Sequence, residues 1–293
     1  MLPSEAPRVP TRGIATMMLG IALFSVLNGV VKAQAQIFPI NQIVFFRNAF
    51  ALLPLFLLLR SSGGSLRAVQ TRPRAHVALS VLFTLTLFCL FYAYSVLPLA
   101  DATAIAFSQP LFVVVLASLL ALERPGALIW WSVAIGLGGV LLMARPGGTG
   151  EAAGYALALL GSVLGAGSML VQRSLALTDA TAVIAIYTLG ISALCVMPTL
   201  PLSWVAPTGP QLLGLTAMGV ASGLCQFLIV HAFYHATASQ IAPVTYTKML
   251  WAIVIGYLWF GDVPSVFVLT GAVIVMAAAA LSLHSARDAR GSE

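Results

Sequence analysis

The segments "LLALERP" (Leu119–Pro125) and "LWFGDVP" (Leu258–Pro264) decide the fold, because they place one pattern in the chain twice. Each ends an apolar run with an acidic residue, one further residue and a proline, and the two copies lie 139 residues apart. The same shift pairs Phe88 with Phe227. We therefore predict that the two halves of the chain share one pattern of helices.

The composition is that of a membrane protein. The 293 residues are 60% hydrophobic and 8% charged, with a mean hydropathy of +1.01, whereas soluble domains carry about 25% charged residues. The formal charge of +6 could suggest nucleic acid, but the basic residues lie in short gaps between apolar runs. This placement is typical of membrane orientation, so we expect contact with lipid and no nucleic-acid partner.

Ten apolar runs have about the 20 residues that a helix needs to cross the hydrocarbon. We therefore predict an all-α integral membrane protein, and no region resembles a linker or a soluble domain. The ten runs are roughly 14–35, 40–60, 75–97, 100–122, 127–145, 153–174, 182–202, 211–235, 240–261 and 265–284.

Lysine and arginine placement predicts the orientation. With the N-terminus inside, ten basic residues fall on the cytoplasmic side and two, Lys32 and Arg145, on the other. We therefore expect both termini in the cytoplasm. Residues 1–13 form a polar leader without a cleavage signal, and 285–293 form a tail.

The repeat and the count of runs together predict an inverted topology. Runs three to five correspond to runs eight to ten under the 139-residue shift. Five spans in each half, 14–145 and 153–284, make the second half enter the membrane from the opposite side. Inverted repeats go with alternating-access transport and a substrate site near the midplane.

The run "LPLADATAIAFSQPLFVVVLASLLALERP" (Leu97–Pro125), followed by "GLGGVLLMARPG", resembles the drug/metabolite transporter superfamily of EamA type. The resemblance covers residues 14–284 and implies ten helices, as two inverted five-helix repeats around a central cavity. Within the family, the aromatic and neutral amino-acid exporter branch is the most similar. The second half departs from the pattern, because Met249 stands where the first half has Pro110, although Pro243 could break that helix earlier.

Lys248 is the principal candidate for a binding residue. It lies about 10 Å into its span at 1.5 Å per residue, and a lysine at the centre of the membrane costs about 2.5–3.5 kcal/mol. Either it faces a wet cavity and contacts a substrate carboxylate, or it snorkels toward the cytoplasmic headgroups.

Further polar residues at membrane depth have two interpretations each. Arg47 either anchors at the headgroups or contacts substrate, and Asn28 either makes an interhelical hydrogen bond or contacts ligand. Tyr92 and His231 are equivalent under the shift, as are Gln109 and Lys248, and each either lines a cavity or packs. Additional possible liners of the cavity are Gln226, Tyr246 and Trp251.

The absence of a deep carboxylate predicts the kind of substrate. Asp101 and Glu123 flank span four, and Asp262 ends span nine, whereas exporters of cationic drugs usually need a buried acid. We expect a secondary transporter that exports amino acids or related carboxylate-bearing compounds, with an unassigned coupling ion. No catalytic residue, cofactor or metal ligand is predicted, since the sequence has no P-loop, no nucleophile–His–acid set and no metal-ligand spacing of its cysteines.

Alternative functions remain open at this point. A transporter of drugs or other metabolites would have the same architecture. An integral membrane enzyme acting on lipid-linked substrates would need clustered histidines or acids, but the four histidines are scattered with no acid partner in sequence reach. A retinal-type photoreceptor would need a buried carboxylate counter-ion, and a channel would need a filter motif. The sequence shows neither.

Overall fold

The computed structural model describes residues 10–61, 72–120, 126–144, 152–235, 244 and 247–291. Within these ranges the chain forms helices and no strand, which confirms the predicted all-α class there. The elements are α1 (Pro10–Gln34), α2 (Ile40–Ser61), α3 (Pro73–Val96), α4 (Leu99–Ala106), α5 (Gln109–Leu119), α6 (Ala127–Ala144), α7 (Ala152–Leu175), α8 (Thr181–Val196), η2 (Met197–Thr199), α9 (Leu200–Ser203), α10 (Gly209–His235), α12 (Thr247–Phe260) and α13 (Val266–Gly291).

The outer surface of the bundle is apolar. Leu57, Leu141 and Leu258 each expose 70% or more of their surface, which would be unfavourable in water and is ordinary for helices in lipid. Seven of the described helical segments are long and apolar enough to cross a membrane, and three shorter apolar helices accompany them: Trp130–Met143, Thr247–Phe260 and Val266–Ala278. The chain is a multi-pass membrane protein, and the count of ten crossings stays a prediction.

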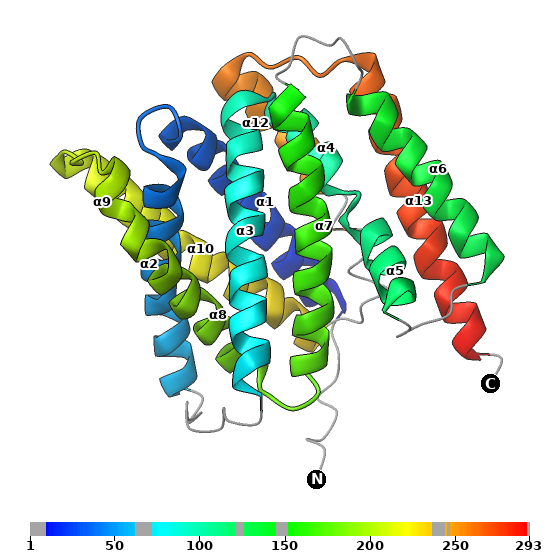
Figure 1. Ribbon diagram of the computed structural model, residues 1–293, viewed down its shortest axis with the longest axis horizontal. Helices are drawn as coiled ribbons and strands as arrows, with labels where there is room; N and C mark the ends of the chain where they lie inside the picture. Colours follow the sequence, from blue (N-terminus) through cyan, green and yellow to red (C-terminus); the bar gives the residue numbers. More distant parts are fainter. Residues whose placement is uncertain are drawn as a thin grey trace.

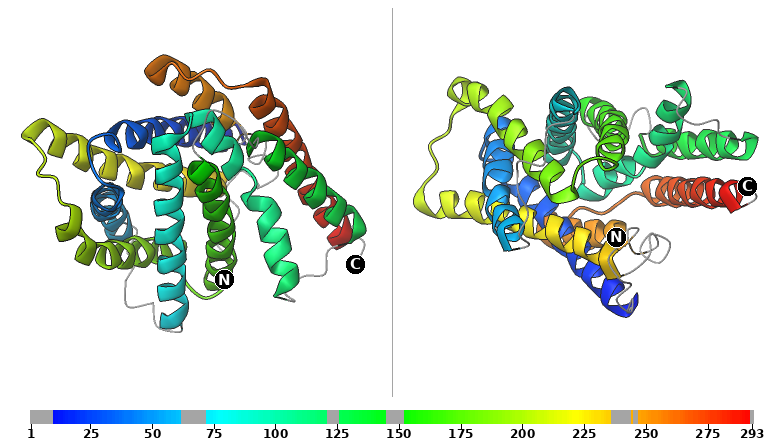
Figure 2. Two further views of the ribbon diagram at one scale, coloured as in Figure 1. Left: turned by 45° about the horizontal axis from the view of Figure 1, so that its top comes forward. Right: turned by 90° about the horizontal axis from the view of Figure 1, so that it is seen from below.

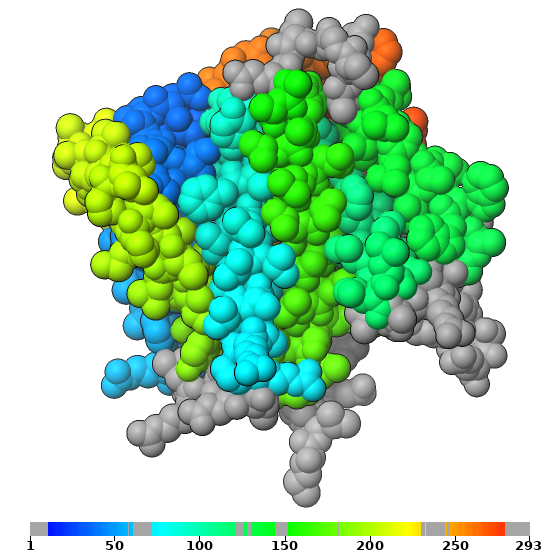
Figure 3. All heavy atoms as spheres, in the orientation of Figure 1, coloured from blue at the N-terminus to red at the C-terminus, as the bar shows by residue number. Residues whose placement is uncertain are grey.

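The long helices run up and down in alternation, so the start of α1 and the end of α13 lie on the same side of the bundle (Figure 1). α6 and α13 lie side by side at one edge, as two further views also show (Figure 2). α3 and α7 cover one face together, with α8 beside α3 (Figure 3).

Helices from the two halves pack against each other in matched pairs. α1 packs on α10 as α3 packs on α7, and α2 contacts α10 as α8 contacts α3. The pairs α2 with α8, α4 with α12 and α6 with α13 each join one half to the other. Exchanging the two halves under the 139-residue shift keeps the pairs α2 with α8 and α6 with α13 and interchanges the other matched pairs. The counterpart of α4 with α12 lies mostly outside the described residues.

The fourth predicted span consists of two helices rather than one. α4 ends at Ala106 and α5 begins at Gln109. Pro110 has no backbone N–H to donate to the carbonyl of Ala106, and its ring disfavours a continuous helix there. By contrast, α12 is continuous across Met249, while Pro243 lies outside the described residues.

The main hydrophobic core lies between the halves. It includes Val44, Leu97 and Leu99 from the first half with Met249 and Ile255 from the second. Because burial of these side chains requires both halves, neither half has a separate core of comparable size among the described residues. The core brings α2 and α12, which carry the two central cations, into one bundle.

Candidate functional site

Lys248 points into the bundle. Its ammonium lies 4.7 Å from the centroid of the Phe24 ring on α1, a cation–π contact with another helix. The side chain sits deep within the protein and still keeps part of its surface accessible. This geometry favours the inward orientation of Lys248 over snorkelling along its own helix.

Arg47 on α2 is held by its neighbours. Its Nη1 donates to Asn48 Oδ1 at 3.2 Å, and its guanidinium carbon lies 5.7 Å from the Phe91 ring centroid. Asn48 donates to Ser192 Oγ at 2.8 Å, and Thr84 Oγ1 donates to the same hydroxyl at 2.6 Å. This buried chain of hydrogen bonds ties α2, α3 and α8 together at the turn that carries Arg47.

The two cations belong to one electrostatic environment. Lys248 contacts Phe24 and Arg47 contacts Phe91, and both rings belong to the main core between the halves. The two positive charges therefore act on each other across that core. Among the side chains that the structure describes, no carboxylate lies within ion-pair distance of either cation. Unneutralised charges at membrane depth are stable only beside water, dipoles or a bound anion.

A third cation, Lys32, does have an acidic partner. Its ammonium forms an ion pair with Asp262 and also donates to the Leu97 carbonyl at 3.1 Å. The same Asp262 oxygen accepts the N–H of Leu99, the first residue of α4, at 3.1 Å. Asp262 therefore links the end of α1 and the start of α4 to the α12–α13 connection. It lies about 20 Å along the α12 axis from Lys248.

Asp101 is buried, although the sequence placed it only at the flank of a span. It lies in the first turn of α4, where the helix dipole favours a negative charge. Its Oδ2 accepts a hydrogen bond from the Tyr155 hydroxyl of α7 at 3.0 Å. This carboxylate is engaged by α7 and does not contact the central cations.

His76 has an acid partner, but one that lies far from it in the sequence. Its Nε2 lies 2.8 Å from Asp179 Oδ2, and both side chains are buried where α3 meets the α7–α8 connection. The pairing joins residues 103 apart in sequence, which a local motif search could not find. In the described part of the chain no third His, Cys, Asp or Glu joins them to make a metal-type cluster.

Two predicted candidates occupy tight helix contacts. Gln109 begins α5 and packs against α7, where a Cβ on Gly165 would lie 3.1 Å from its carboxamide carbon. Asn28 is buried on α1. Beside it, a Cβ on Gly29 would lie 2.7 Å from Ile255 Cγ2 of α12, so α1 and α12 approach each other closely at this glycine.

The remaining candidates are not gathered around the cations by any described contact. Tyr92 and Gln226 are half-buried on α3 and α10, and Trp251 is 37% exposed on α12. The side chain of His231 and the whole of Tyr246 lie outside the described residues. Their roles stay predictions.

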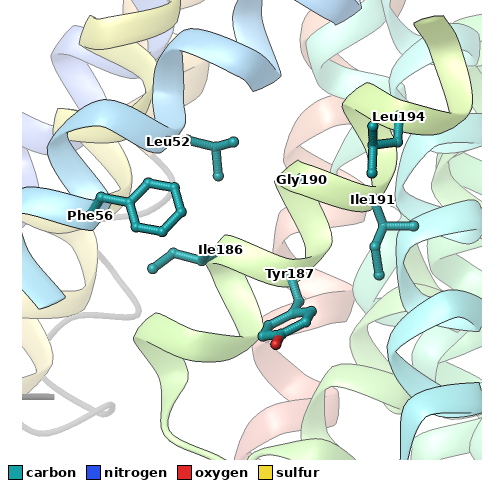
Figure 4. A pocket seen from close by; sticks show the side chains of 7 residues that line it. All are labelled: Leu52, Phe56, Ile186, Tyr187, Gly190, Ile191 and Leu194. Carbon is teal, nitrogen blue, oxygen red and sulfur yellow. The ribbon is translucent and has the colours of Figure 1, made fainter. Parts of the chain in front are cut away.

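Two apolar pockets lie away from the central cations. A groove of about 270 Å³ runs between α2 and α8 and is lined almost wholly by apolar side chains. Figure 4 shows Leu52 and Phe56 of α2 facing Ile186 and the rest of the α8 wall across it. The groove contains neither Lys248 nor Arg47.

Comparison with known proteins now identifies the family. The EamA-like transporter family matches residues 11–145. The pseudopaline exporter of Pseudomonas aeruginosa is 33% identical over 268 residues, which are 91% of this chain and 94% of that protein. The chain belongs to the EamA-like transporter family.

Other relatives are named for different cargoes. The S-adenosylmethionine uptake transporter of Rickettsia bellii is 25% identical and covers 98% of both chains. The riboflavin transporter of Rhizobium johnstonii is 26% identical over 94% of this chain and 91% of its own. A solved crystal structure shares the fold with a TM-score of 0.64 at 20% identity, over 96% of this chain and 99% of the other.

Family membership supports the drug/metabolite transporter resemblance and transport of small molecules as the class of function. None of the three relatives is named for an amino acid, so the aromatic and neutral amino-acid branch stays a prediction. The cargo of this EamA-like chain has to be inferred from its own residues.

Proposed function

We propose that this chain is a secondary transporter of the inner membrane that moves a small carboxylate-bearing metabolite, an amino acid or a related compound. The observation that carries the proposal is the presence of Lys248 and Arg47 inside the bundle without a described carboxylate partner. Positive charge at the site favours an anionic or zwitterionic substrate over a cationic one.

Lys248 and Arg47 supply the positive charge that attracts a carboxylate-bearing substrate in this proposal. Gln109, Tyr92 and Asn28 supply uncharged hydrogen-bonding groups, and Phe24 and Phe91 give the cations aromatic neighbours. His231, Tyr246 and Trp251 are proposed as further liners on the basis of the sequence.

Alternating access between two inverted halves, with both termini in the cytoplasm, is the proposed mechanism. The matched helix pairs between the halves support it. The Lys32–Asp262 pair joins the halves at one end of the bundle, so opening that end requires the pair and the Leu99 hydrogen bond to separate. Export is the direction proposed from the sequence.

Counterflow in proteoliposomes tests the proposal. Vesicles loaded with an unlabelled compound take up its labelled form only if the protein carries it. The panel should contain amino acids, mono- and dicarboxylates, and organic cations of matched size. We expect vesicles with the protein to take up more of a labelled carboxylate-bearing compound than protein-free vesicles do. The proposed function would be refuted if folded protein took up only cations, or no compound of the panel.

A further inference from the structure

In the described part of the bundle each carboxylate has a hydrogen-bonding or ion-pair partner, whereas the two central cations have no anionic partner. Asp101, Asp179 and Asp262 are each engaged, by Tyr155, His76 and Lys32 respectively. These three are the acidic residues whose side chains the structure describes. Lys248 and Arg47 are therefore left as two positive charges that the described part of the protein does not neutralise.

We infer that the site formed by Arg47 and Lys248 takes a substrate with two negative groups, one for each cation. This inference rests on the proposed function and specifies its substrate class as a compact dicarboxylate, including amino acids with a second acidic group. A single carboxylate would neutralise one cation and leave the other buried and unpaired.

Arg47 is arranged to bind one carboxylate in a forked geometry. A guanidinium has five N–H donors, and among the described residues only Asn48 accepts from it. The remaining donors match the two oxygens of a carboxylate. Asn48 is itself fixed by Ser192, so the fork is held on a rigid turn of α2.

Lys248 supplies the second positive group from the other half of the chain. Its ammonium rests on Phe24 at 4.7 Å, which leaves its N–H donors without a described acceptor. A substrate that bridges Arg47 on α2 and Lys248 on α12 therefore contacts both halves. Removing the mutual repulsion of the two cations adds to the preference for a dianion.

Binding of matched compounds to the full-length protein in detergent is the test. Thermal shift and calorimetry would compare malonate, succinate, glutarate and adipate with their monoamides and diamides, which keep the size and change only the charge. We expect one dicarboxylate to bind at least about 10-fold more tightly than its monoamide, the factor that corresponds to one additional ionic contact.

Substitutions assign that preference to the two cations. In Lys248→Met and Arg47→Gln the ratio between dicarboxylate and monoamide should fall below about 3-fold, because one anionic group loses its partner. The matched control is Arg12→Gln, which removes an exposed positive charge on α1 and should keep the full ratio. Size-exclusion profiles identify any variant that fails to fold, and if Arg47→Gln fails, Lys248→Met alone carries the test.

Equal binding of dicarboxylate and monoamide, or no binding of any dicarboxylate by folded protein, would overturn the inference. If the protein bound or transported a monocarboxylate amino acid with no preference for a second acidic group, the dicarboxylate inference would be wrong. The proposed function would still hold in that case. Loss of all counterflow would count against the proposed function instead.

Discussion

A charged lysine or arginine at membrane depth has a high free-energy cost. Lys32 differs from Lys248 and Arg47 in the groups that stabilise its charge. Lys32 has Asp262, a backbone carbonyl and the Phe260 ring at 4.6 Å. Among the described residues, the two central cations contact aromatic rings and, for Arg47, the Asn48 amide. We propose that the Lys32–Asp262 pair stabilises the fold and that Lys248 and Arg47 bind substrate.

Lys248→Ala tests this division. Transport at low substrate concentration should fall at least about 10-fold, the equivalent of one lost ionic contact of 1.4 kcal/mol. The melting temperature in detergent should stay the same or rise, because an unneutralised charge is removed. Counterflow and thermal unfolding measured on one preparation check both expectations, and parental transport rates in the variant would remove Lys248 from the site.

Asp262→Asn should act on stability. It leaves Lys32 without a counter-charge and weakens the bond to Leu99, so we expect a loss of about 3 kcal/mol, the scale for breaking a buried pair from one side. Lys32→Met should cost less, because Asp262 keeps the Leu99 N–H at the start of α4. Reversible unfolding in detergent compares the two; a larger loss in Lys32→Met would contradict the assigned geometry.

At the scale of elements, the sequence predicted helices better than it predicted their contacts. The lengths of apolar runs and the positions of Gly and Pro are local properties, and they located the apolar helices. The α4–α5 interruption is also local, since Pro110 causes it, but span length alone concealed it. The pairing of α6 with α13 could not be inferred, because it depends on glycines in both halves that meet only after folding.

Gly271 is the sharpest test of that pairing. A Cβ there would lie 2.4 Å from Met143 Cγ and 2.6 Å from the Gly139 carbonyl oxygen. Gly271→Ala should therefore destabilise the protein by about 1 to 3 kcal/mol, the usual effect of overpacking. Gly138→Ala is the matched control on α6, since a Cβ there meets nothing within 4 Å, and it should be neutral or slightly stabilising.

At the scale of the whole molecule, the repeat in the sequence indicated which helices correspond but not which residues meet. Lys32 and Asp262 are 230 residues apart, and His76 and Asp179 are 103 apart. No local pattern marks either pair. Lys248 could be singled out from one segment, whereas the core that it shares with Arg47 forms only when the two halves pack.

Alternating access is the central claim, and the Lys32–Asp262 end of the bundle is where it can be tested most directly. Lys32→Cys and Asp262→Cys would be combined in a chain whose three native cysteines, Cys89, Cys195 and Cys225, are replaced by alanine. A cleavable bifunctional thiosulfonate reagent then joins the α1 end to the α12–α13 connection. Single-cysteine variants treated in the same way control for modification alone.

The decisive measurement is counterflow before cross-linking, after it and after cleavage of the reagent. If this end must open in each cycle, transport falls to the level of protein-free vesicles on cross-linking and returns on cleavage. Unchanged transport by fully cross-linked protein would contradict alternating access at this end.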